Sequence, residues 1–98
     1  PINFNAALQR IMETEDLPVF LRQAKPLILE AIAEALQLHG TNESVLLAAA
    51  DVKLHDAALK ADIRYFMHEY NMALYSPAEH DIVQLKVLTE RMIRGLVA

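Results

Sequence analysis

Hydrophobic side chains recur along this chain with the spacing of amphipathic helices. Phe4, Leu8 and Ile11 follow one another at intervals of four and three residues, which makes a narrow apolar stripe. Acidic side chains then crowd between positions 13 and 16, where negative charge at a helix C-terminus is unfavourable. The pattern predicts a first helix that begins near residue 3 or 5 and ends near Thr14.

A second helix is predicted from the Asp-Leu-Pro sequence that follows. Asp16 is a good N-cap, and Pro18 suits the first helical turn because it lacks a backbone N–H. The helical pattern then continues to Leu38, with Pro26 inside it. A proline there removes a hydrogen bond and clashes with the preceding turn. We therefore predict a kink near residues 23–25, or two helices with a tight joint.

A long third helix is predicted from Glu43 to Tyr75, after a cap at Thr41 or Asn42, because this segment holds neither glycine nor proline. A continuous helix of that length would span about 50 Å. A compact domain of this size has a radius of gyration near 13 Å, so such a helix does not fit inside it. Either the helix breaks around residues 51–56, or it projects and packs against a second copy.

The sequence Ser76-Pro77-Ala78-Glu79 is the strongest local helix signal in the chain. It combines an N-cap serine, a first-turn proline and a glutamate at the third helical position, which together form a capping box. We predict a helix from there to about Gly95, with an apolar seam of heptad-like spacing. The fold expected for residues 1–98 is a single all-α domain, a four- to five-helix bundle with a kinked second helix and a long third one.

The predicted third helix carries two apolar stripes on nearly opposite sides. One stripe is Ala48, Val52, Leu59, Ile63, Phe66 and Tyr70, and the other is Leu47, Leu54, Ala58, Ala61, Tyr65 and Met72. An edge helix of a monomer needs one stripe, so both sides are expected to be covered, either within the domain or by a partner. We favour a homodimer with two-fold symmetry. The predicted interface is Leu54, Ala61, Tyr65 and Met72, with Val83 and Val87 from the last helix.

Composition narrows the functional classes. The net charge is −4 and the basic residues are scattered, whereas nucleic-acid binding needs a positive surface. A DNA-binding regulator is disfavoured further by Glu79 and Asp81 at the start of the last helix. The absence of cysteine excludes disulfides and thiolate chemistry and fits the cytoplasm. The hydrophobic fraction of 54% exceeds the usual value, which favours burial against another chain, and no apolar run is long enough to cross a membrane.

Aromatic and polar side chains gather between positions 65 and 80, and a small-molecule pocket there is the alternative function. Its candidate residues are Tyr65, Phe66, His68, Met72 and Tyr75. Asp51 and His55 share a helix face at a spacing of four, but the chain has no His-x-x-x-His and no Glu-x-x-His pattern. We predict no catalytic, cofactor or metal site.

The expected function is therefore that of a non-enzymatic helical protein–protein interaction module, such as a small adaptor, inhibitor or chaperone-like protein. We expect it to self-associate, to bind a further protein partner, and to be of bacterial or phage origin. The chain is expected to bind neither nucleic acid nor membrane, and the DNA-binding regulator remains the third alternative.

Overall fold

The computed structural model describes residues 2–97, and all of the regular structure in this range is helical. The helices are α1 (Phe4–Met12), α2 (Leu17–Leu36), α3 (Glu43–Lys53), α4 (Ala57–Tyr75) and α5 (Ile82–Val97), with one short 3-10 helix, η1 (Pro77–Glu79). The prediction of an all-α bundle with up to five helices is confirmed.

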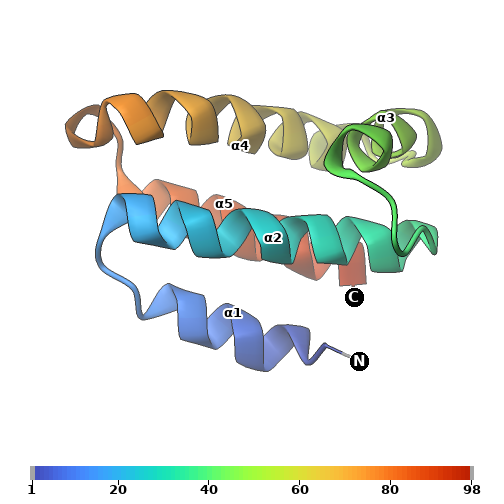
Figure 1. Ribbon diagram of the computed structural model, residues 1–98, viewed down its shortest axis with the longest axis horizontal. Helices are drawn as coiled ribbons and strands as arrows, with labels where there is room; N and C mark the ends of the chain where they lie inside the picture. The colour runs from blue at the N-terminus through green and yellow to red at the C-terminus, as the bar shows by residue number, and fades with distance from the viewer. Residues whose placement is uncertain (1, 98) are drawn as a thin grey trace.

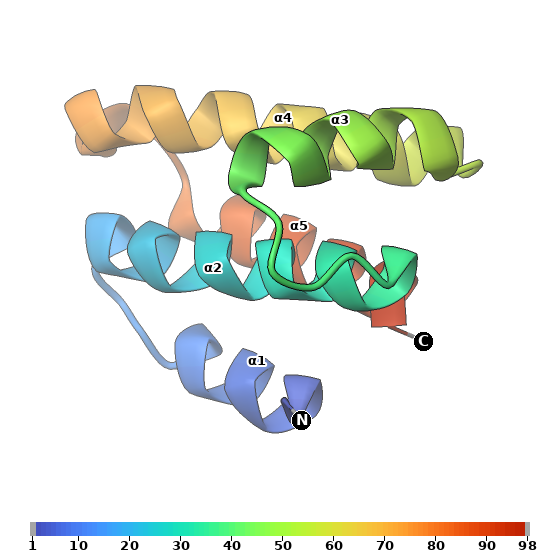
Figure 2. The same cartoon turned by 45° about the vertical axis from the view of Figure 1, so that its right-hand side comes forward.

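The helices form three layers around α2. Helices α2 and α5 run side by side in the same direction through the middle, α1 lies on one side of them, and α4 lies on the other (Figure 1). Helix α3 lies beside α4 and covers part of α2 (Figure 2). The radius of gyration of 12.8 Å is that of a compact domain of this length.

The core is built around the apolar side chains of α2. Phe20, Leu21, Ile28 and Ile32 are inaccessible to solvent. They are joined by Phe66 of α4 and by Met92 and Ile93 of α5. Thr89 of α5 is also fully buried, and its hydroxyl donates a hydrogen bond of 2.8 Å to the carbonyl of Leu85. The one polar side chain inside this core is therefore satisfied.

Side-chain caps begin the first four α-helices. Asn3, Asp16, Asn42 and Asp56 each accept a hydrogen bond from the backbone N–H three residues further on, at 2.9 to 3.1 Å. The caps at Asp16 and Asn42 were expected from sequence, the second as an alternative to Thr41, because Asn and Asp side chains replace the bonds that the first turn lacks. The cap at Asp56 marks a helix start that the sequence pattern did not assign.

The predicted kink in the second helix is wrong, because α2 is one continuous helix through Pro26. The backbone group that loses its partner is the carbonyl of Arg22, four residues before the proline. Arg22 and Pro26 both lie on the exposed side of α2, where water can replace the missing bond. The helix ends two residues earlier than expected, with Gln37 in the left-handed conformation at φ 56°. The N–H of Leu38 then donates to the carbonyl of Ala33 at 3.0 Å.

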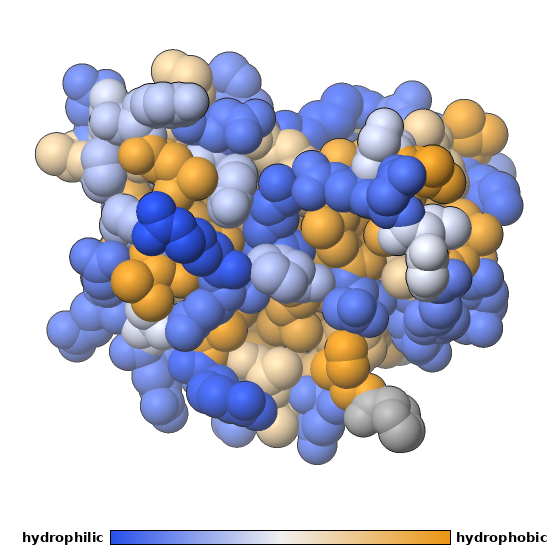
Figure 3. Space-filling model, in the orientation of Figure 1, coloured by the Kyte–Doolittle hydropathy of each residue, from blue (hydrophilic) through white to orange (hydrophobic). Residues whose placement is uncertain are grey.

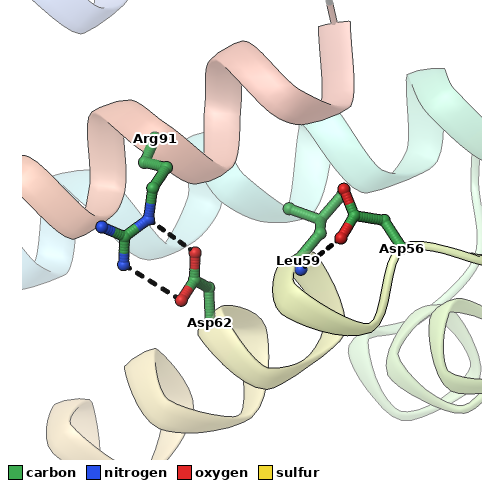
Figure 4. A network of polar contacts seen from close by, with 4 residues as sticks. All are labelled: Asp56, Leu59, Asp62 and Arg91. Carbon is green, nitrogen blue, oxygen red and sulfur yellow. Dashed lines mark hydrogen bonds and ion pairs between the residues drawn. The ribbon is translucent and has the colours of Figure 1, made fainter.

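The long third helix is also wrong, since the segment divides into α3 of 11 residues and α4 of 19 residues. Leu54 leaves the helical conformation with ψ 136°, and Asp56 caps the next helix by accepting from the N–H of Leu59 at 3.1 Å (Figure 4). The unbroken helix of about 50 Å would exceed the longest dimension of the molecule, 35 Å. Breaking it lets α3 fold back onto α2. The alternative of a break within residues 51–56 is therefore the correct one.

The last helix begins five residues later than predicted. Ser76 makes no side-chain cap, and residues 77–79 form the 3-10 helix η1. Asp81 starts α5 instead, where its carboxylate accepts from the N–H of Val83 at 2.9 Å. His80 is turned toward α4 and pairs with Glu69. This contact links the segment between η1 and α5 to α4.

Candidate interaction surface

Helix α4 has one face in the core and one face in solvent. The core face follows the first predicted apolar stripe: Leu59, Ile63 and Phe66 are buried, and Tyr70 is half-buried. The ammonium group of Lys25 on α2 lies 4.4 Å from the centre of the Tyr70 ring, which ties this face to the bundle. The second stripe points away from the bundle.

The exposed face of α4 carries large apolar side chains. Tyr65 and Met72 are 53% and 52% exposed, and Ala61 between them in the helical pattern is also exposed. On α5, Val83 and Val87 are 64% and 56% exposed. Helix α5 buries its opposite side, as the heptad-like seam predicted, so these valines are free of the core.

The ion pair between Asp62 and Arg91 fixes how α4 and α5 sit beside each other. Nε and Nη2 of Arg91 donate to the two carboxylate oxygens of Asp62 at 2.8 and 3.1 Å (Figure 4). Tyr65 follows Asp62 by about one turn, and Val87 precedes Arg91 by about one turn. Helices α4 and α5 are antiparallel. The step from Asp62 forward to Tyr65 and the step from Arg91 back to Val87 therefore lead in the same direction along the hairpin. We call the exposed apolar side chains of these two adjacent helices the α4–α5 face: Ala61, Tyr65, Met72, Val83 and Val87.

The charged groups of this face are paired within the chain. The Arg91 guanidinium donates to the Asp62 carboxylate, which raises the pKa of Arg91 above its ordinary value. The negative charge of Glu69 raises the pKa of the Tyr65 phenol. Glu69 also pairs with His80, and both of these side chains are largely covered. The α4–α5 face thus presents apolar groups beside charges that already have partners.

Leu54 does not share this surface. It is half-buried at the junction of α3 and α4, where it packs against the core. Of the residues predicted for a pocket, Phe66 is fully buried, Tyr75 is 90% exposed, and His68 lies on the exposed side of α4. These side chains point in different directions, and the structure does not bring them around one hollow.

A hollow of about 540 Å³ lies instead where α1, α2 and α5 meet. It is lined by Ile2, Phe4, Glu30, Glu34, Ala35, His39, Leu96 and Val97. It is open to solvent, and on the side of the molecule seen in Figure 3 the apolar side chains form separate patches between polar ones. Sequence reasoning missed this hollow because its walls come from segments far apart in the chain.

Asp51 and His55, placed on one face of the predicted third helix, are not paired with each other. Asp51 pairs with Arg64 of α4 at 2.8 Å, and His55 is exposed in the junction between α3 and α4. Within residues 2–97, no group of three or more potential metal-ligating side chains gathers. In the same range, every helix is too short or too polar to cross a bilayer.

Comparison of the chain with known protein families, curated proteins and solved structures finds no match.

Proposed function

We propose that this protein is a non-enzymatic protein–protein interaction module that self-associates through the α4–α5 face. The observation that carries the proposal is the exposure of Tyr65, Met72, Val83 and Val87, each more than half exposed, on two adjacent helices. Tyrosine and methionine are enriched at protein interfaces. In a dimer with two-fold symmetry, each copy contributes this same surface.

The size of the α4–α5 face indicates how strong the association is. Helix α5 has 16 residues, and two packed helices of that length cover roughly 500 Å² on each copy. An interface of about 1,000 Å² in total lies at the small end of specific complexes, where binding is weak or transient. We therefore expect a dimer that dissociates in the micromolar range, so that the free face is also available to another helical protein.

A single charged side chain in the centre of the face tests the proposal. Val87→Asp should raise the dimer dissociation constant at least tenfold, because the carboxylate would lose its water on association and the nearby Arg91 is already paired with Asp62. Sedimentation equilibrium over a range of concentrations measures this constant. Valine and aspartate have similar helix propensities, so the unfolding free energy of the monomer should change by no more than about 0.5 kcal/mol.

The matched control is Val52→Asp on α3. Val52 is 77% exposed and lies outside the α4–α5 face, so this variant should associate like the original chain. A chain that stays monomeric at every concentration would contradict self-association. Equal weakening by both variants would place the contact elsewhere.

The class of protein proposed is a small cytoplasmic adaptor, inhibitor or chaperone-like protein. A cysteine-free chain is compatible with a reducing compartment, which supports this location. Binding of a second protein partner is part of the proposal, and the same Val87→Asp variant should weaken it.

A further inference from the structure

We propose that the junction Leu54–Asp56 is a hinge through which two copies of this chain exchange their α4–α5 hairpins. The exchanged unit is residues 57–97, and the unit that stays in place is α1, α2 and α3. This inference concerns contacts inside the bundle, so it does not depend on association through the α4–α5 face.

The first observation is that α3 belongs to the N-terminal unit. Its two buried side chains, Leu46 and Ala50, pack on α2. Its links to α4 are polar and exposed: Asp51 pairs with Arg64, and the ammonium of Lys60 donates to the carbonyl of Asp51 at 3.0 Å. A small hollow of about 90 Å³ remains between the two helices. The chain therefore divides between α3 and α4 with little loss of packing between those two helices.

The second observation is that residues 43–75 are suited to a continuous helix. The segment has no glycine or proline, so its composition does not interrupt a helix. In a continuous helix the buried side chains of Ala50 and Leu59 would lie on opposite sides, which lets α3 stay on its own α2 while α4 packs on the partner's. The break itself rests on the extended conformation of Leu54 and on the cap by Asp56. Both residues can adopt helical angles, so straightening needs no unusual backbone.

The third observation is that an exchanged pair regains the contacts it gives up. Straightening the hinge carries the hairpin away from its own α2, and the partner's hairpin takes its place. Contacts such as Lys25 with the Tyr70 ring, and the bond from the Lys86 ammonium to the Met12 carbonyl at 2.7 Å, then form between chains. The difference between the two states is confined to the hinge and to the entropy of association, which is why exchange of identical elements is a low-cost route to a dimer.

The pair Asp51 and Arg64 can be used to distinguish the closed chain from the exchanged dimer. Their side chains touch in the closed chain and are both 63% exposed, so replacing them should leave the fold intact. In a straightened helix, the two positions of one chain are about 20 Å apart, and Asp51 faces position 64 of the other chain. The chain has no cysteine of its own, so a D51C/R64C variant can be joined specifically by a short bismaleimide.

The variant is refolded at high protein concentration, separated into monomer and dimer by gel filtration, and then cross-linked. We expect the monomer fraction to give only intrachain product, and the dimer fraction to give a covalent dimer on a denaturing gel. To separate this outcome from association through the α4–α5 face, the experiment is carried out with V87D also present.

Two further hinge variants should move the equilibrium between the closed monomer and the exchanged dimer in opposite directions. Ala57→Pro fits the first position of α4, where the backbone N–H has no helical partner, but inside a continuous helix it removes a hydrogen bond and clashes with the preceding turn. It should strongly reduce the interchain product. Asp56→Ala removes the cap that only the closed form has, from two chains per dimer, and should raise the association constant by roughly tenfold.

Two results would overturn the hinge: a dimer fraction whose cross-links are all intrachain, or the absence of any dimer after refolding, with Asp56→Ala included. An Ala57→Pro variant that exchanges as readily as the original chain would overturn it as well. If Val87→Asp abolishes association through the α4–α5 face but the interchain cross-link still forms, the result supports the hinge and tests the face separately.

Discussion

Helices α2 and α4 are almost equal in length, with 20 and 19 residues, but they are covered very differently. Helix α2 buries nine side chains and is contacted by all four of the other α-helices. Helix α4 buries four and leaves Tyr65 and Met72 in solvent. Both helices carry apolar residues around much of their circumference. What differs is the number of neighbours that the chain supplies to each.

The apolar side chains of α2 and those on the outer face of α4 therefore have different roles, the first in stability and the second in recognition. Apolar side chains of α2 hold the bundle together, because removing them opens a cavity in a close-packed core. Apolar side chains on the outer face of α4 contribute little to the folded monomer, and they remain available for another surface. The following substitutions test that division.

The largest effect is expected from Phe20→Ala in α2. Phe20 is inaccessible to solvent, so its truncation should lower the unfolding free energy by about 3–5 kcal/mol. Tyr65→Ala on the outer face of α4 is the control and should change it by about 0.5 kcal/mol or less. Urea denaturation followed by circular dichroism measures both. Similar losses in the two variants would contradict the division between the helices.

Pro26→Ala, also in α2, should have an intermediate effect on the unfolding free energy, and it should raise this free energy rather than lower it. Alanine restores the N–H that donates to the carbonyl of Arg22, and it has a far higher helix propensity than proline. Because Pro26 is exposed, the change disturbs no packing, and the unfolding free energy should rise by about 1–3 kcal/mol. The same denaturation experiment applies. A loss of stability would mean that the proline ring makes a contact that alanine cannot replace.

The smallest effect concerns Tyr65, whose pKa is raised chiefly by the charge of Glu69. A pKa that is higher in the folded chain means that folding favours the protonated phenol. The resulting stabilisation is complete below about pH 10 and is lost as the pH rises through the higher folded-state value.

Ultraviolet titration of tyrosinate should show this pKa falling toward its ordinary value in Glu69→Gln. Tyr65→Phe identifies which of the three tyrosines gives the signal. If the titration of Tyr65 does not change in Glu69→Gln, the side chain of Glu69 does not act on the outer face as described.

Helix content and most helix starts followed from local sequence. Asp16 caps α2 as expected, Asn42 rather than Thr41 caps α3, and the first helix begins near residue 3 as predicted. The α4 part of the first apolar stripe, with Leu59, Ile63 and Phe66, was assigned correctly because burial repeats with the helical period, but Ala48 and Val52 of the same stripe are exposed on α3. Tyr65, Met72, Val83 and Val87 are exposed, and the interface predicted for them stays a prediction, while Leu54 is half-buried where α3 ends.

The errors arise where a contact distant in sequence competes with a local preference. Ser76 and Glu79 have the spacing of a capping box, but the pairing of His80 with Glu69 draws the segment toward α4 and leaves Asp81 to start α5. The break before Asp56 needs no glycine, since α3 gains its place on α2 when the chain turns back. Neither of these packing contacts can be read from the capping and propensity signals of the segments themselves.

The parallel pairing of α2 with α5 has a consequence for biosynthesis. A ribosome completes α2 at Leu36, but α5 ends 61 residues later at Val97, as the bounds of the two helices show. At a synthesis rate of about 5–20 residues per second, this interval lasts about 3–12 s. During that time the side of α2 that α5 will cover faces water, and the nascent chain must shield it from aggregation or have it shielded by a chaperone.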